Sequence, residues 1–443
     1  MSNSATGLKE EEKEKSINSK DGTSPAKPEP PTEERPPSIT KALEGFLCEA
    51  DALADSLPLV MPLLTTSTTQ ASKEFGDFLE ERCEKTPEGS FVIPPEEYTE
   101  FLNLQRRMQR NRRALQIVPR SFLTSLISHY DAFIGNLLRA LFYMKPEVLN
   151  SSEHHLTFKE LTSFVSIEAA RASVVEKEVE TLLRQSHADQ FEETEKRFGV
   201  PLRKDLPSWP TFIEVTERRN LFVHCNGIVS AQYLTVCKRH GVDCSKVKVG
   251  KELQVGPKYI KLAYATVLEI GIKLAHVVWR HLKPEEIENA DASLNDVCLN
   301  LIRDEKYSVA QTVLDFACQY KTFGSESGRK VLLLNRAQSY KWGGQDKQAI
   351  EILATEDWNA ANEKFRLGAA VLNDDFQSAA QIMRHIGADS EPSKGDYKEW
   401  PMFKMFRATP EFAKAFAEVF GEPFGSVTAN EISQKDEVGG SIQ

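Results

Sequence analysis

The sequence lacks the features by which membrane and secreted proteins are recognised. No apolar run reaches the roughly eighteen residues that a membrane-spanning helix needs. The densest apolar segment, residues 57–64, is short and contains two prolines. The first fifteen residues hold no apolar core of the kind found in secretion signals. We therefore expect a soluble, cytoplasmic protein with no membrane partner.

Motifs of cofactor-dependent and metal-dependent enzymes are also missing. The chain has no glycine-rich phosphate loop, no Gly-x-Ser-x-Gly nucleophile turn and no paired metal-binding carboxylates. Its seven cysteines form no Cys-x-x-Cys pair. One loose cluster, Cys237, His240 and Cys244, lacks the tight spacing and the fourth ligand of a zinc site. We expect reduced thiols, no metal and no cofactor.

The overall charge and composition further limit the functions and folds that this protein can have. A net charge of -10 argues against a protein that coats nucleic acid generically, although local basic patches could still bind phosphates. Hydrophobic residues make up 40% of the chain, enough for a folded core. Leu, Ala, Glu, Lys and Arg dominate, and few β-branched runs alternate strictly, so the predicted fold class is all-α.

The N-terminal part divides into a tail and a helical region. Residues 1–38 contain six prolines and few large apolar side chains, so we expect a disordered tail. Residues 39–114 form the expected N-terminal helical region. Its first helix begins at Ser38 or Thr40 and a second spans 70–84. A brief extended piece is expected at 90–94, before a helix entered through Pro95.

That last helix ends in a group of five arginines within eight residues. The group consists of Arg106, Arg107, Arg110, Arg112 and Arg113. One interpretation is a surface that faces RNA phosphates. The other is a solvated helix face whose arginines pair with Glu96, Glu97 and Glu100.

Residues 115–284 are expected to form an antiparallel helical bundle. Its helices are predicted over 122–141, 167–198, 230–240 and 256–282, with one more that runs from residue 210 or 211 through 227. The first of these carries two adjacent apolar stripes. Such a surface suits either the core of a bundle or a dimer interface.

Residues 292–424 contain small residues in pairs twelve positions apart. The pairs are Cys298 with Ala310, Ala337 with Ala349, and Gly368 with Ala380. Small residues let the two helices of a hairpin approach closely, and the pattern resembles tetratricopeptide repeats. The resemblance implies a surface for a protein partner; alternatively, the hairpins only support the bundle. A helical cap is expected over 400–424 and a loose tail over 425–443.

The segment Glu217 to Gly227, ERRNLFVHCNG, carries the candidate chemistry. Its predicted helix places Arg219, Asn220 and His224 on one face. An arginine can grip a phosphate through its planar fork of donors, and a histidine can transfer protons near neutral pH. Arg218 is an alternative for the phosphate role. In a purely structural interpretation, Arg219 pairs with Glu178 or Glu214. His129, His187 and His276 have no Arg-Asn companion, so we interpret them as structural.

The Arg-Asn-x-x-x-His pattern in its helical setting resembles the HEPN (higher eukaryotes and prokaryotes nucleotide-binding) ribonucleases, over roughly residues 115–282. The resemblance implies an HEPN-like bundle that dimerises. It assigns Arg219, Asn220 and His224 to a composite catalytic site. The implied function is metal-independent endoribonuclease activity, with prokaryotic defence or toxin-type RNA degradation as the expected setting. The alternative is a non-catalytic dimeric helical scaffold or an RNA- or protein-binding module.

Overall fold

The computed structural model describes residues 37–151, 155–204 and 206–425, and these residues form an all-α structure, as predicted. The strands in this part are β1 (Glu84–Lys85) and β2 (Phe91–Val92), which pair antiparallel. The extended piece expected at 90–94 is therefore present as β2. The tails predicted over 1–38 and 425–443 lie almost wholly outside the described residues.

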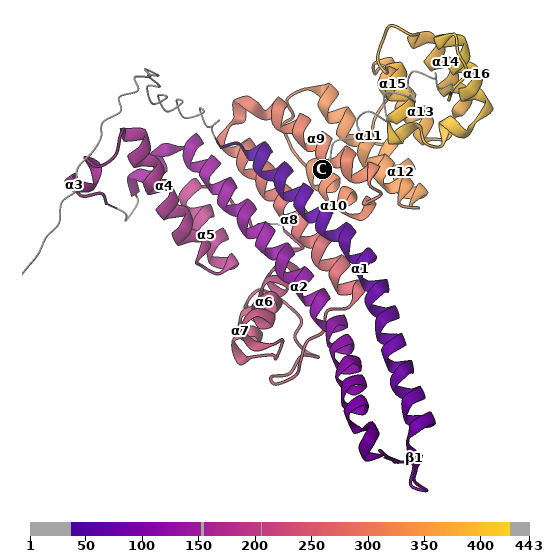
Figure 1. Ribbon diagram of the computed structural model, residues 1–443. Helices are drawn as coiled ribbons and strands as arrows, with labels where there is room; N and C mark the ends of the chain where they lie inside the picture. Colours follow the sequence, from indigo (N-terminus) through magenta and orange to yellow (C-terminus); the bar gives the residue numbers. More distant parts are fainter. Residues whose placement is uncertain (1–36, 152–154, 205, 426–443) are drawn as a thin grey trace, which may run out of the picture. The chain divides into compact units, whose positions relative to one another are not determined.

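The described part of the chain begins with a hairpin of two long helices, α1 (Ile39–Arg82) and α2 (Tyr98–Met144), which lie side by side (Figure 1). Ser38 is the N-cap of α1, as expected. The two helices predicted before residue 84 are in fact one, and this helix continues through Pro58 and Pro62. A proline inside a helix removes one amide donor and crowds the carbonyl four residues before it. The packing of α1 along α2 holds the helix together despite both prolines.

Helix α2 is also longer than expected. It follows a short 3-10 turn, η1 (Pro95–Glu97), and continues through Pro119 for 47 residues. The boundary expected between residues 114 and 115 falls inside this helix, so the structure has no division there. The apolar residues of the second half of α2 form the centre of the bundle core. They are Phe122, Leu123, Leu126, Ile127, Tyr130, Phe133, Ile134, Leu137, Leu138 and Leu141, all of them buried.

The remaining helices of the bundle pack against α2 or against one another. They are α4 (Ile167–Leu183), α5 (His187–Phe198), α6 (Trp209–Cys225), α7 (Ala231–Arg239) and α8 (Pro257–Leu282). A short turn, η2 (Pro146–Ser151), and the four-residue helix α3 (Phe158–Leu161) precede them. The single helix predicted over 167–198 is two helices. The break occurs because the Ser186 side chain accepts a hydrogen bond from the Asp189 amide and starts α5.

Helix α8 is apolar on nearly all sides because it lies inside the fold. Within the described residues it is the one helix long and apolar enough to cross a membrane. However, 72% of its apolar window is buried inside the structure. Burial in a protein core accounts for that composition, so the composition is weak evidence for a membrane span.

Three helical hairpins follow the bundle, as the spacing of small residues predicted. They are α9 (Ile287–Arg303) with α10 (Tyr307–Ala317), α11 (Glu326–Trp342) with α12 (Asp346–Leu353), and α13 (Glu363–Leu372) with α14 (Phe376–Ile386). All six small residues of the three pairs are buried on these helices. The bundle core continues into the first hairpin and reaches Leu332 of α11.

Contacts at the end of α8 tie the first hairpin to the bundle. A 3-10 turn, η3 (Pro284–Glu286), separates α8 from α9. The guanidinium of Arg280 pairs with Asp291 and lies 4.0 Å from the ring centroid of Tyr320. The other Asp291 oxygen accepts from the Gly324 amide at 2.8 Å. The boundary expected at 284–292 thus marks a change of architecture but not a break in packing.

The last described residues form a smaller aromatic core, where a helical cap was expected. Its elements are α15 (Lys394–Glu399), η4 (Pro401–Phe403), η5 (Phe406–Ala408) and α16 (Pro410–Phe420). Phe403, Phe406, Phe412 and Phe416 are buried in this core together with residues of α13 and α14. The cap therefore covers the end of the third hairpin.

Candidate functional site

The candidate motif lies on α6, as its sequence predicted. Pro210 stands in the first turn of the helix, and Asn226 ends it in the left-handed conformation, with φ of 50°. Gly227 follows with φ of 82°, and a Cβ there would lie 2.8 Å from the Phe222 ring. The Asn-Gly pair at the end of the motif is thus explained by the chain reversal after the helix.

Arg219 is held on two sides by neighbouring side chains. Its Nη2 lies 2.5 Å from Oδ2 of Asp131, which comes from α2. Its Nη1 donates to Oδ1 of Asn220 at 3.1 Å. The Nε atom is buried and has no hydrogen-bond partner within the part of the chain that the structure describes. The guanidinium is therefore fixed in place while some of its donors remain unused.

Asp131 binds a second side chain with its other oxygen. Its Oδ1 lies 2.8 Å from Nε2 of His187, at the start of α5. The His187 ring is buried, and its centroid lies 5.8 Å from that of Phe212 and 6.1 Å from that of Tyr130. One carboxylate thus joins three helices, α2, α5 and α6. The structural interpretation of His187 missed this link to the motif.

Asp131 itself was not singled out in the sequence. A signal was available, because Asp131 is the only acidic residue between Glu100 and Glu147 and lies between two apolar stripes. A lone carboxylate in such a helix needs a cationic or hydrogen-bonding partner once it is packed. The sequence did not show which partner that would be, since Asp131 and Arg219 are 88 positions apart.

Two further ionisable groups lie beside this cluster. Oε1 of Glu217 lies 3.5 Å from Nδ2 of Asn220. Burial raises the pKa of Glu217, and the neighbouring His187 partly offsets that rise. Burial, together with the charge of Asp131, raises the pKa of Tyr130. The Tyr130 hydroxyl has no hydrogen-bond partner among the described residues. Tyr130 therefore stays neutral, and the Glu217 carboxyl holds its proton more strongly than an exposed glutamate.

His224 stands apart from the other motif residues. It is exposed in the last turn of α6, and no hydrogen bond or ion pair joins its side chain to another residue between 37 and 425, the undescribed gaps excepted. Val223 beside it is 51% exposed. Of the three predicted site residues, the structure thus brings Arg219 and Asn220 into contact and leaves His224 facing solvent. The prediction that all three share one face is wrong, because five positions correspond to about 140° around an α-helix.

Arg218, the alternative phosphate ligand, is committed to a different network. Its Nε donates to Glu214 at 2.7 Å, and its guanidinium lies 3.9 Å from the ring centroid of Tyr259. The buried Glu214 carboxylate also accepts the hydroxyls of Tyr233 and Tyr259, each at 2.7 Å. Arg218 and Glu214 therefore serve the packing of α6 against its neighbours. The suggested pairing of Glu214 with Arg219 is wrong, because this carboxylate turns to Arg218.

The other partner suggested for Arg219, Glu178, pairs with Arg197 at 2.5 Å. The ion-pair partner of Arg219 is Asp131 instead. His129 and His276 lie outside the cluster. His129 binds Glu49 at 2.7 Å, and His276 is buried in α8 with both ring nitrogens unpaired among the described residues.

The arginine group on the outer half of α2 is fully on the surface. All five side chains, Arg106, Arg107, Arg110, Arg112 and Arg113, are exposed. Arg107 pairs with Glu74 of α1 at 2.6 Å, and the other four have no ion-pair partner in the described part of the chain. Glu97, one of the suggested partners, binds Arg82 instead. Four of the five cations are thus available to an outside ligand.

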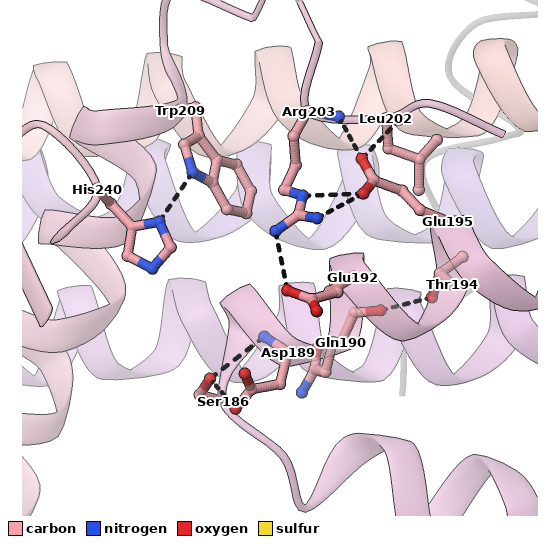
Figure 2. A network of polar contacts seen from close by, with 10 residues as sticks. All are labelled: Ser186, Asp189, Gln190, Glu192, Thr194, Glu195, Leu202, Arg203, Trp209 and His240. Carbon is pink, nitrogen blue, oxygen red and sulfur yellow. Dashed lines mark hydrogen bonds and ion pairs between the residues drawn. The ribbon is translucent and has the colours of Figure 1, made fainter.

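The segment that leads into α6 is fastened by a separate network, shown in Figure 2. The Glu195 carboxylate accepts the backbone amides of Leu202 and Arg203 and the guanidinium of Arg203, at 2.6 to 2.9 Å. Nδ1 of His240 accepts from Nε1 of Trp209 at 3.3 Å. These contacts set where α6 begins, and hence where its motif lies.

The loose Cys237, His240 and Cys244 cluster is part of the packing around α7. Cys237 is fully buried, and burial raises the pKa of its thiol to about 12. His240 is engaged by Trp209. Within the described residues, no group of three His, Cys, Asp or Glu side chains is arranged to hold a metal ion.

Comparisons with models of protein families, with curated proteins and with solved structures found no match to this chain. Its function is therefore argued from the geometry of the site.

Proposed function

We propose that this protein is an endoribonuclease that cleaves RNA without a metal ion and works as a dimer. One observation carries the proposal: Asp131 and Asn220 hold the guanidinium of Arg219 in place on the same helix that exposes His224. A fixed cation and a free imidazole, five positions apart, are two of the groups that phosphodiester cleavage through the ribose 2′-hydroxyl requires.

The reaction follows from the chemistry of these groups. A base removes the proton of the 2′-hydroxyl, and the 2′-oxygen attacks the adjacent phosphorus. The bond to the 5′-oxygen breaks, and an acid protonates that oxygen as it leaves. The products are a 2′,3′-cyclic phosphate and a 5′-hydroxyl. His224 would transfer the proton. The N–H groups of Arg219 Nη1 and Nη2 that Asn220 and Asp131 leave unused would stabilise the charge that develops on the phosphate oxygens.

Asp131 and His187 act as positioning residues in this scheme. A free arginine samples many rotamers, and ordering it on the substrate costs conformational entropy. Its ion pair with Asp131 already orders Arg219 in the folded protein, and His187 holds the Asp131 carboxylate in place. The site therefore has its cation in place before RNA binds, which favours catalysis by electrostatic stabilisation.

A second copy of the chain completes the proposed site. One histidine cannot be both the base that takes the first proton and the acid that gives the second in a single step. The His224 of a second protomer would supply the missing group. This arrangement requires a two-fold axis near the end of α6, which would bring the two His224 side chains together. Val223 and Ile228, which are 51% and 40% exposed, are apolar side chains on the surface that the second protomer would contact.

The proposal is tested by incubating the full-length protein with mixed-sequence RNA in excess EDTA. Cleavage is expected, and Arg219→Ala and His224→Ala should each lower its rate by about 100-fold or more. Arg184→Ala and His281→Ala, at exposed positions on other helices, are the matched controls and should cleave like the wild type. RNA that stays intact with the wild-type protein would contradict the proposal.

A non-catalytic scaffold is the second candidate, and the ion pair itself favours it. In that function the Arg219 and Asp131 pair only ties α6 to α2, and the hairpins α9 to α14 bind a protein partner. If the protein is a scaffold, it should not cleave RNA but should still form a dimer. Sedimentation of the wild type and of Val223→Asp, which places a charge beside His224, measures the dimer independently of any activity.

A further inference from the structure

Arg106 and Arg113 of the arginine group lie on the same face of α2 as Asp131, the residue that pairs with Arg219 of the candidate site. Arg113 and Asp131 are 18 residues apart, which is five turns of an α-helix at about 3.6 residues per turn. Arg106 and Asp131 are 25 residues apart, within about 20° of seven full turns. Helix α2 is continuous between them. The stripe from Arg106 to Asp131 thus connects the exposed cations to the residue that holds Arg219.

The charge along this stretch is of one sign. Between Glu100 and Asp131 the helix has no acidic residue, and Arg106, Arg110, Arg112 and Arg113 have no ion-pair partner among the described residues. Residues 56–72 of the neighbouring helix α1 carry no charge at all, and several of them bear hydroxyl groups. Unpaired cations beside an uncharged, hydroxyl-bearing surface are suited to a chain of phosphates.

We propose that α2 binds RNA along its length, so that Arg106, Arg110 and Arg113 hold the phosphates upstream or downstream of the bond that is cut. This inference rests on the proposed function, and it adds a substrate class: RNA long enough to reach both places. The 18 to 25 residues between them correspond to about 27 to 38 Å of helix. At about 3.4 Å per nucleotide of stacked strand, that length is roughly eight to eleven nucleotides.

The geometry predicts a length threshold that a compact active site would not show. A stacked RNA of six nucleotides spans about 20 Å, so it can occupy the site without reaching the arginines. An RNA of thirty nucleotides can do both. The arginines should therefore lower the KM for long RNA and leave the cleavage of short RNA unchanged. An acidic protein bound to the same arginines would produce no dependence on RNA length.

The test compares full-length wild type with the triple variant Arg106→Glu, Arg110→Glu and Arg113→Glu. A matched control carries the same change of charge at three exposed positions elsewhere, Arg171→Glu, Arg184→Glu and Lys347→Glu. Cleavage of mixed six-nucleotide and thirty-nucleotide RNA pools is measured over a range of salt concentrations. The arginine variant should cut the long pool at least tenfold more slowly and the short pool at the wild-type rate. The slope of the logarithm of RNA affinity against the logarithm of salt concentration should become shallower by about two, because three phosphate contacts are lost.

Two results would overturn the inference. One is equal slowing of both pools, and the other is a rate on the long pool that matches the wild type and the control. A second measurement keeps the inference separate from the proposed function. Fluorescence anisotropy of a labelled thirty-nucleotide RNA measures its binding to His224→Ala without turnover. Adding the three arginine changes to His224→Ala should weaken this binding tenfold. If no variant cleaves RNA but this loss occurs, the proposed catalysis fails and the RNA surface stands; unchanged anisotropy overturns the surface as well.

Discussion

The carboxylate of Asp131 on α2 lies 2.5 Å from the guanidinium of Arg219 on α6, although the two residues are 88 positions apart in the chain. Asp131→Asn removes the charge and keeps the shape. It should lower RNA cleavage by about 10-fold to 100-fold, because Arg219 loses the group that orients it. It should also cost about 1 to 3 kcal/mol of unfolding free energy, since a half-buried cation loses its ion-pair partner.

Urea unfolding and cleavage assays on the same preparations measure both effects. The matched control is Glu176→Gln, which breaks the more exposed pair with Arg139 and should cost less than about 1 kcal/mol. Full activity in Asp131→Asn would show that the ion pair is structural only.

The two histidines near the motif should separate activity from stability. His224 is exposed and unpaired among the described residues, so His224→Ala should change the unfolding free energy by less than about 0.5 kcal/mol while abolishing cleavage. His187 is buried against Tyr130 and Phe212 and bonded to Asp131, so His187→Ala should cost about 1 to 3 kcal/mol. Thermal unfolding of both variants, compared with their cleavage rates, checks the pattern. A large loss of stability in His224→Ala would mean that its side chain is packed rather than free.

The stability of the bundle should depend on pH through His276. This residue is buried in α8 with both ring nitrogens unpaired among the described residues, and burial lowers its pKa from 6.5 to about 3. In the unfolded chain the imidazole takes up a proton as the pH falls below about 6.5, whereas the folded protein does not. This group therefore lowers the unfolding free energy as the pH falls from about 6.5 towards 3, by up to about 1.4 kcal/mol per pH unit.

His276→Leu removes that proton-binding group. As the pH falls from 6 to 4.5, the unfolding free energy of the wild type should therefore decrease steadily relative to that of His276→Leu. Denaturant unfolding at several pH values measures it, with His281→Leu at the exposed end of the same helix as the matched control. A difference that stays constant across this range would show that His276 finds a partner or is protonated in the folded state.

The junction between the bundle and the hairpins should tolerate no side chain at Gly324. A Cβ there would lie 2.4 Å from the Cα of Glu288 on α9, so backbone must move. Gly324→Ala should cost about 1 to 3 kcal/mol of unfolding free energy. Gly45→Ala, in α1 with open space around the new methyl group, should instead stabilise by up to about 1 kcal/mol. Melting temperatures that move in opposite directions support this packing; equal shifts would contradict it.

The sequence predicted the helical architecture well because its signals were local. Apolar periodicity and small residues twelve positions apart report packing that each helix makes with its chain neighbour. The paired small residues Gly368 and Ala380 are therefore found on the facing helices α13 and α14. The errors arose where tertiary packing overrides a local rule. Pro58, Pro62 and Pro119 lie inside helices that the α1 and α2 pairing holds together.

Only part of the candidate site could be predicted from the sequence, because the rest depends on tertiary packing. Arg219 and Asn220 are neighbours in the chain, and their contact follows from the helix. Asp131 and His187 come from other helices, and only the packing of α2, α5 and α6 shows that one carboxylate contacts both His187 and Arg219. The exposed position of His224 depends likewise on what packs against the end of α6.

The central claim is cleavage through the ribose 2′-hydroxyl at the Arg219 and His224 site. The most direct measurement is mass spectrometry of the fragments formed in EDTA from a thirty-nucleotide RNA and from the same sequence with 2′-deoxyribose throughout. The proposal predicts RNA fragments that end in 2′,3′-cyclic phosphate and a deoxyribose strand that stays intact. Cleavage of both strands, or RNA ends that carry a 3′-hydroxyl, would contradict it.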